Sequence, residues 1–124
     1  MADLLADSYA FLALIEGNDR YKAIFERRNF VTTAMNVVEV YSALLRRMEP
    51  AAARELARTM LSSVVEVPPE TALAAAEFRR RMRESGMECS HIDAWGWAAA
   101  KALGRKFLTG DPAFKGVENV EFVR

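Results

Sequence analysis

The sequence predicts an α/β fold in which helices flank a mainly parallel, five-stranded sheet. The chain has 124 residues, close to the usual size of one domain. Short apolar runs alternate with longer segments whose apolar residues recur every three or four positions, the pattern of strand–helix–strand units. No internal repeat or Pro/Gly/Ser-rich linker divides the chain, so residues 1–124 are expected to form a single domain.

Short apolar runs and flanking turn residues indicate five strands. The expected strands are residues 3–6, 30–32, 64–67, 106–108 and 120–123. Longer segments with helical periodicity lie between them, and one helical turn is expected after Asp111. The expected helices are residues 8–16, 19–28, 33 to about 50, about 51 to 61, 70–85 and 90–103.

Capping signals set several of these helix ends. Asp7 or Ser8 can cap the first helix, because a side-chain oxygen at that position accepts a hydrogen bond from a free backbone N–H. Thr33 can cap the third helix in the same way. Gly86 and Gly104 close the last two long helices, since glycine readily adopts the left-handed conformation found after helix ends.

Composition narrows the possible functions. Seventeen basic and seventeen acidic residues give no net charge, so any nucleic-acid contact must use a local patch. The single cysteine excludes an intramolecular disulfide and fits a reducing compartment. Asp3 and Asp7 interrupt the apolar N-terminus, which has no basic leader, and no apolar run approaches the roughly twenty residues of a membrane span. We expect a cytoplasmic protein with no membrane partner.

Four acids are placed where they could meet. Asp7 and Asp111 follow strands, Asp93 lies in the first turn of a helix, and Glu39 lies about two turns into another. The carboxyl ends of parallel strands share one edge of the sheet, where ligands collect. A carboxylate cluster without His or Cys neighbours suits Mg²⁺ or Mn²⁺, which prefer oxygen ligands.

Each acid also has a purely structural interpretation. Asp7 and Asp111 can be helix caps, the latter with Pro112 at the first helical position. Asp93 stands three residues after Ser90, as in a capping box. A helical wheel places Glu39 opposite the apolar side of its helix, where a solvated side chain is usual. Because the helix that follows Ser90 is apolar nearly all round, however, a carboxylate entering it requires compensation.

Four segments together resemble PIN-domain proteins, and among them the ribonuclease toxins of VapBC-type toxin–antitoxin pairs. The segments are DSYAFLAL at Asp7, NVVEVYSALLR at Glu39, HIDAWGWAAAKALG at Asp93 and FLTGDPAF at Asp111. They cover essentially the whole chain in the family's order. Tyr9 departs from the family's pattern, in which a small or polar residue often occupies this position, and this affects the expected details of the substrate pocket.

The resemblance implies a three-layer α/β/α arrangement and metal-dependent hydrolysis of RNA. Asp7, Glu39 and Asp93 would be the catalytic metal ligands for Mg²⁺ or Mn²⁺, and Asp111 a fourth, more variable acid. Asn36 and Thr109 stand where supporting polar residues occur. The resemblance also implies an antitoxin partner and a homodimer, and the apolar residues Tyr41 and Leu45 are in keeping with an interface.

Basic residues on two helices and the segment around Cys89 also have polar or reactive side chains that could serve a function. Arg46 and Arg47 are weak candidates for RNA contact, whereas the group Arg79, Arg80, Arg81 and Arg83 favours a solvated, salt-bridged helix face. A catalytic nucleophile among Cys89, Ser90 and His91 is rejected, because adjacent residues cannot easily aim at each other as a catalytic pair. A zinc site there is rejected too, because no second Cys or His supplies the remaining ligands.

Two other functions are compatible with part of the pattern. A catalytically inactive PIN-fold module that binds RNA or protein stays open, since a fold does not guarantee activity. A receiver-type signalling domain is disfavoured, because residues 64–67 run into Pro68 and Pro69 instead of an acceptor aspartate.

Overall fold

A computed structural model describes residues 3–124, which form a four-stranded, fully parallel sheet in the order β2–β1–β3–β4. The strands are β1 (Leu4–Ala6), β2 (Phe30–Val31), β3 (Lys106–Thr109) and β4 (Val120–Phe122). In register, Leu5 of β1 pairs with Val31 and with Phe107, and Phe107 pairs in turn with Val120. The α/β class and the parallel sheet predicted from the sequence are confirmed.

Six α-helices and two 3-10 turns connect the strands in the described part of the chain. They are α1 (Ser8–Ile15), α2 (Asp19–Arg27), α3 (Ala34–Leu45), α4 (Pro50–Arg58), η1 (Leu61–Ser63), α5 (Thr71–Glu84), α6 (His91–Ala102) and η2 (Pro112–Phe114). The predicted third helix ends early, at Leu45, and Pro50 begins α4 because proline fits the first turn of a helix. None of the helices described is both long and apolar enough to cross a membrane.

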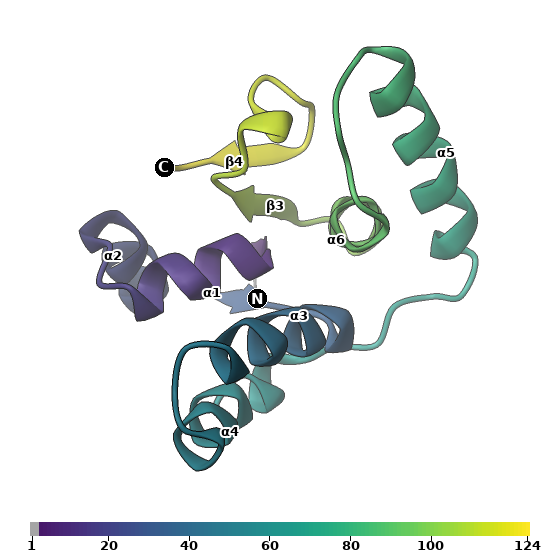
Figure 1. Cartoon of the computed structure of the whole chain (residues 1–124). Coiled ribbons are helices and arrows are strands. Elements are labelled where there is room, and N and C mark those ends of the chain that lie inside the picture. Colours follow the sequence, from purple (N-terminus) through teal and green to yellow (C-terminus); the bar gives the residue numbers. More distant parts are fainter. Residues whose placement is uncertain (1–2) are drawn as a thin grey trace.

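Two apolar cores lie on opposite faces of the sheet, because successive strand residues point to opposite sides. Leu5 and Phe107 pack with the residues of α5 and α6. Leu4 and Leu108 pack with those of α1, α2 and α3. Figure 1 shows α5 beside α6, with α3 and α4 in another part of the molecule. The strands are therefore covered on both faces, which brings the helix N-termini to the edge where β1 and β3 end.

The predicted strand at residues 64–67 is wrong. Only Val64 pairs, in a single parallel bridge with Thr32. The backbone N–H of Thr32 donates to Ser63 O at 2.9 Å, and Thr32 O accepts from Val65 N–H at 3.0 Å. The chain then runs into Pro68 and Pro69, which have no N–H to continue a ladder. An apolar run therefore passes the sheet edge without becoming a fifth strand.

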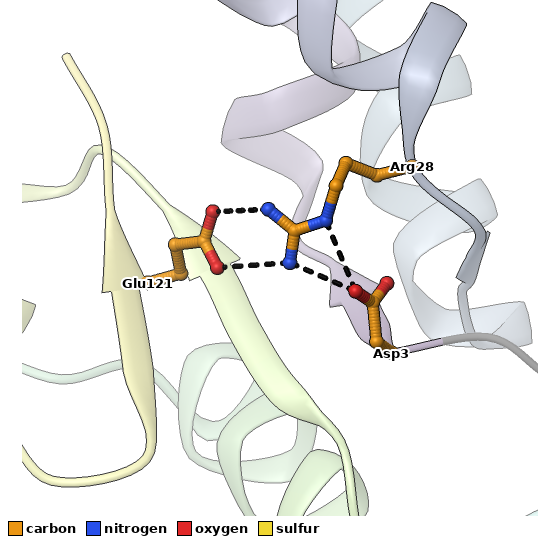
Figure 2. A network of polar contacts seen from close by, with 3 residues as sticks. All are labelled: Asp3, Arg28 and Glu121. Atoms are coloured by element: carbon orange, nitrogen blue, oxygen red, sulfur yellow. Dashed lines mark hydrogen bonds and ion pairs between the residues drawn. The ribbon is translucent and has the colours of Figure 1, made fainter.

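A polar network ties three segments together away from the edge that carries the acids. Arg28, which follows α2, forms two hydrogen bonds with the carboxylate of Glu121 in β4, at 2.9 and 3.2 Å. The same guanidinium binds Asp3, with a hydrogen bond of 3.0 Å and an ion pair of 2.9 Å (Figure 2). Asp3 precedes β1, whereas Asp7 follows it, so the network stabilises the opposite end of that strand.

Candidate active site

Asp7 lies between β1 and α1, at the carboxyl edge of the sheet. Its backbone N–H donates to Leu108 O at 3.0 Å, which continues the pairing of β1 with β3 and fixes the residue. The side chain is only 3% exposed. Its Oδ2 accepts a hydrogen bond from Thr109 Oγ1 at 2.7 Å, while Oδ1 is buried and has no hydrogen-bond partner among the described residues. A buried carboxylate oxygen without a partner is costly, so it requires a proton or a cation.

Burial is the main reason that the pKa of Asp7 rises from 3.8 to about 7. The negative charges of Asp93 and Glu39 raise this pKa further, and the hydrogen bonds from Thr109 and the Ser8 backbone lower it. Without a cation, the Asp7 carboxyl is therefore partly protonated near neutral pH.

A buried polar cluster positions the start of α3 against the start of α1. Thr33 caps α3 by accepting from the Asn36 backbone N–H, and its hydroxyl donates to Asn36 Oδ1 at 2.7 Å. The Asn36 side-chain amide donates in turn to Ser8 Oγ at 3.0 Å. Asn36 is fully buried. Asn36 therefore links Ser8, the residue next to Asp7, to the helix that carries Glu39. The sequence did not indicate this contact between Asn36 and Ser8.

Glu39 lies on α3 one turn after Asn36, and its side chain is partly buried. The helical wheel indicated a solvated position, because it accounts only for the apolar side of one helix. In the structure α3 contacts both α1 and α6, and these neighbours partly cover the opposite side. Glu39 therefore faces the edge of the sheet that also holds Asp7.

Asp93 is both a helix-capping residue and a member of the acidic group, two positions that the sequence left as alternatives. It completes a capping box with Ser90: its backbone N–H donates to Ser90 Oγ at 3.0 Å, and its Oδ2 accepts from the Ser90 N–H at 3.3 Å. Partial burial raises the pKa of the Asp93 carboxyl, the bonds from Ser90 lower it, and the charges of Asp111 and Glu39 raise it. Burial and the neighbouring carboxylates thus disfavour the negative charge of Asp93, while the capping box at the N-terminus of α6 favours it.

Asp7, Glu39 and Asp93 form one group, with one carboxylate oxygen from each lying within 4.8 Å of the other two. Mg²⁺ and Ca²⁺ bind oxygen ligands at about 2.0–2.6 Å, so ligands around one ion stand up to about 5 Å apart. The spacing and the unpartnered Asp7 Oδ1 fit a hard divalent cation. The group contains no nitrogen or sulfur ligand, which disfavours zinc.

Asp111 stands beside this group and is not part of the close triad. Its carboxylate caps η2 by accepting from the Ala113 N–H at 3.0 Å, as its structural interpretation predicted. Its charge nevertheless raises the pKa of Asp93, which places it within electrostatic range. Thr109 connects Asp111 to Asp7, since its hydroxyl donates to the Asp7 carboxylate and accepts from the Asp111 backbone N–H at 3.1 Å.

Gly110 allows the segment between Thr109 and Asp111 to pack closely against Tyr9 and Val123. A Cβ atom there would lie 2.3 Å from the Tyr9 ring and 2.3 Å from Val123 O. Tyr9, the residue that departs from the family's pattern, covers Gly110 and lies 5.9 Å from the ring of Tyr21. Tyr21 donates in turn to the backbone oxygen of Val123. These contacts fix the segment between Thr109 and Asp111.

Arg46 and Arg47 are not brought to the acids. Arg46 is the C-cap residue after α3, about 10 Å along the helix from Glu39 at 1.5 Å per residue. It donates to Ser42 O at 3.3 Å, and Arg47 lies 3.9 Å from the Glu16 carboxylate. The candidate nucleophile Cys89 is buried, and burial is the main reason that its pKa rises to about 11, so its thiolate is disfavoured.

Solved structures of toxin–antitoxin proteins share this fold. VapC20 from Mycobacterium tuberculosis, described as a sarcin–ricin-loop-cleaving toxin, has 24% sequence identity over 98% of both chains and a TM-score of 0.77. A DNA-bound VapBC from Salmonella typhimurium has 11% identity, with 99% of this chain and 98% of that chain covered and a TM-score of 0.76. A toxin–antitoxin complex from Klebsiella pneumoniae has 16% identity over 95% of both chains, with a TM-score of 0.75.

No protein of curated function matches the chain. Residues 4–120 match the family model of the PIN domain, a span that includes Asp7, Glu39, Asp93 and Asp111. The fold is VapC-like, and the match covers nearly the whole sequence. This chain therefore belongs to the PIN-domain family.

Proposed function

We propose that the protein is a divalent-metal-dependent endoribonuclease, and that it is the toxin of a toxin–antitoxin pair. The observation that carries the proposal is the group formed by Asp7, Glu39 and Asp93 around a buried carboxylate oxygen that has no partner. Membership of the PIN family and the resemblance to VapC toxins support hydrolysis of RNA phosphodiester bonds. Arg46 and Arg47, at the far end of α3, remain weak candidates for RNA contact.

Asp7, Glu39 and Asp93 would hold Mg²⁺ or Mn²⁺, which supplies Lewis-acid activation of the phosphodiester and of the attacking water. Thr109 fixes the orientation of Asp7 by donating to its Oδ2, which leaves Oδ1 for the cation. The capping box holds Asp93 through Ser90. Because ligand binding requires ionised carboxylates, metal affinity should rise with pH through the raised pKa of Asp7.

Asp111, which caps η2, is proposed as an outer acid of the same site. Its carboxylate is held by the Ala113 N–H and is near enough to influence Asp93. Thr109 and Asn36 are proposed as supporting residues, the first through its hydrogen bond to Asp7 and the second through Ser8 and Thr33.

The proposed protein partners are an antitoxin and a second copy of the chain. Several similar structures are toxin–antitoxin complexes. The chain also exposes apolar side chains on neighbouring helices, including Val38 and Leu45 on α3 and Leu56 on α4. Light scattering of the purified chain tests the homodimer, and a monomer at high concentration would exclude it.

Cleavage of total RNA tests the enzymatic proposal. The chain, freed of any antitoxin, should cleave RNA with Mg²⁺ or Mn²⁺ and lose this activity in EDTA. Glu39→Gln should abolish cleavage, whereas the control Glu26→Gln, an exposed acid on α2, should retain it. Equal cleavage in EDTA would contradict the metal mechanism. RNA binding without cleavage in any metal would favour the inactive binding module.

A further inference from the structure

A cavity of about 810 Å³ continues from the acidic site toward the C-terminal half of α5. The charged residues that line it are the acids Glu88, Asp93 and Asp111 and the arginines Arg79 and Arg83. Its size lies within the range of cavities that hold small organic ligands, so it has room for more than one phosphate group. Carboxylates suited to a cation and guanidinium groups suited to an anion thus border the same space.

The four arginines of α5, Arg79, Arg80, Arg81 and Arg83, lie in different surroundings. Arg80 forms an ion pair with Glu84 at 3.5 Å, and Arg81 lies over the ring of Phe78 at 5.8 Å. These two residues fit the solvated face that the sequence favoured. Arg79 and Arg83 stand four residues apart, on the same side of the helix, and both face the cavity.

The two cavity arginines differ in how they are held. Arg79 Nε donates to Cys89 O at 2.8 Å, which anchors its guanidinium to the segment that leads into α6. The side chain of Arg83 forms no hydrogen bond or ion pair with any residue in 3–124, and the residue is exposed. The anchored guanidinium of Arg79 and the available one of Arg83 together suit a phosphate group, because each arginine presents several N–H donors to the phosphate oxygens.

Resting on the function proposed above, we propose that Arg79 and Arg83 form a subsite for a phosphate of the RNA strand that flanks the phosphate cleaved at Asp7, Glu39 and Asp93. The scissile phosphate needs the cation, because the carboxylates alone repel it. The flanking phosphate needs no metal, because the arginines supply positive charge. The two guanidinium groups thereby give the net-neutral chain a local positive charge for contact with RNA.

Binding of short single-stranded RNA in EDTA, followed by fluorescence anisotropy at several salt concentrations, tests the subsite without cleavage. Arg83→Gln should weaken binding about tenfold, the loss expected for one hydrogen bond to a charged group. It should also reduce the slope of log affinity against log salt by about 0.7, the value for one phosphate contact on a single strand. Arg83→Lys should keep most of the slope, and the control Arg81→Gln should match the wild type.

Cleavage kinetics with Mn²⁺ provide the second readout. Arg83→Gln should raise KM and leave kcat nearly unchanged, because it removes binding that substrate and transition state share. If the wild type binds RNA and never cleaves it, the proposed enzymatic function fails, and the EDTA measurement still decides the subsite. Unchanged RNA affinity in Arg83→Gln would overturn the subsite and leave the cavity to a protein partner. Equal losses in Arg83→Gln and Arg81→Gln would also overturn it, since they indicate bulk charge.

Discussion

Replacing Asp7 with asparagine should stabilise the metal-free protein at alkaline pH. The pKa of Asp7 rises from 3.8 in the unfolded chain to about 7 in the folded one. Between these values the native state holds a proton that the unfolded state has lost, so stability falls as pH rises. This difference between the two pKa values of Asp7 destabilises the native state by about 4 kcal/mol once pH exceeds about 7. Below about pH 4 both states are protonated, and the penalty disappears.

Asp7→Asn removes this charge and keeps the shape of the side chain. The amide places a donor where Oδ1 has no partner, at a cost of about 1–3 kcal/mol. The expected net gain in the free energy of unfolding is therefore roughly 2 kcal/mol at about pH 8, with no gain at about pH 4. Urea denaturation in EDTA at a series of pH values measures both quantities, and Glu26→Gln serves as the exposed control. An Asp7→Asn protein less stable than the wild type at both ends of the series would refute the reasoning.

Three further substitutions test the supporting structure. Thr109→Val should lower the free energy of unfolding, measured by urea denaturation, by about 1–3 kcal/mol, because it removes the hydroxyl bonded to Asp7. Thr109→Ser keeps the hydroxyl and should retain most of the stability, so equal losses in both variants would argue against the hydrogen bond. Gly110→Ala should cost about 3 kcal/mol in the same measurement, because its Cβ would overlap the Tyr9 ring, and a neutral result would show that the turn can move. Arg28→Ala should cost about 1 kcal/mol and less in high salt, since its ion pairs are partly exposed; a loss that does not depend on salt would contradict an electrostatic origin.

The fold was predictable wherever a local signal and a packing requirement agreed. Thr33 and Ser90 cap helices in the structure as their positions indicated. The failure at residues 64–67 has the opposite origin, because an apolar run indicates burial and does not reveal whether a neighbouring strand is long enough to pair. Gly96 illustrates a similar limit. The structure packs the Phe107 ring against this glycine, and the residue type alone does not identify that neighbour.

The acids could be named from the sequence, but their relative distances could not. A one-helix wheel cannot account for the neighbours of α3, so it could not show that Glu39 is partly buried beside Asp7 and Asp93. Spacing alone also gave Asp111 the same weight as the others, although one of its carboxylate oxygens caps η2 and it lies outside the close triad. Helical spacing separates Arg83 from Arg81, but which of the two faces the cavity depends on the packing of α5 against α6, which the spacing does not contain.

Calorimetric titration with Mn²⁺ near neutral pH tests the central claim most directly, namely that Asp7, Glu39 and Asp93 together bind a hard cation. The wild type should bind Mn²⁺ and release protons as it does so, because the cation displaces the proton held by Asp7. Glu39→Gln should lose this binding, and the exposed control Glu26→Gln should keep both the affinity and the proton release. A wild type that binds no Mn²⁺, or a Glu39→Gln protein that binds it as tightly as the wild type does, would contradict the account.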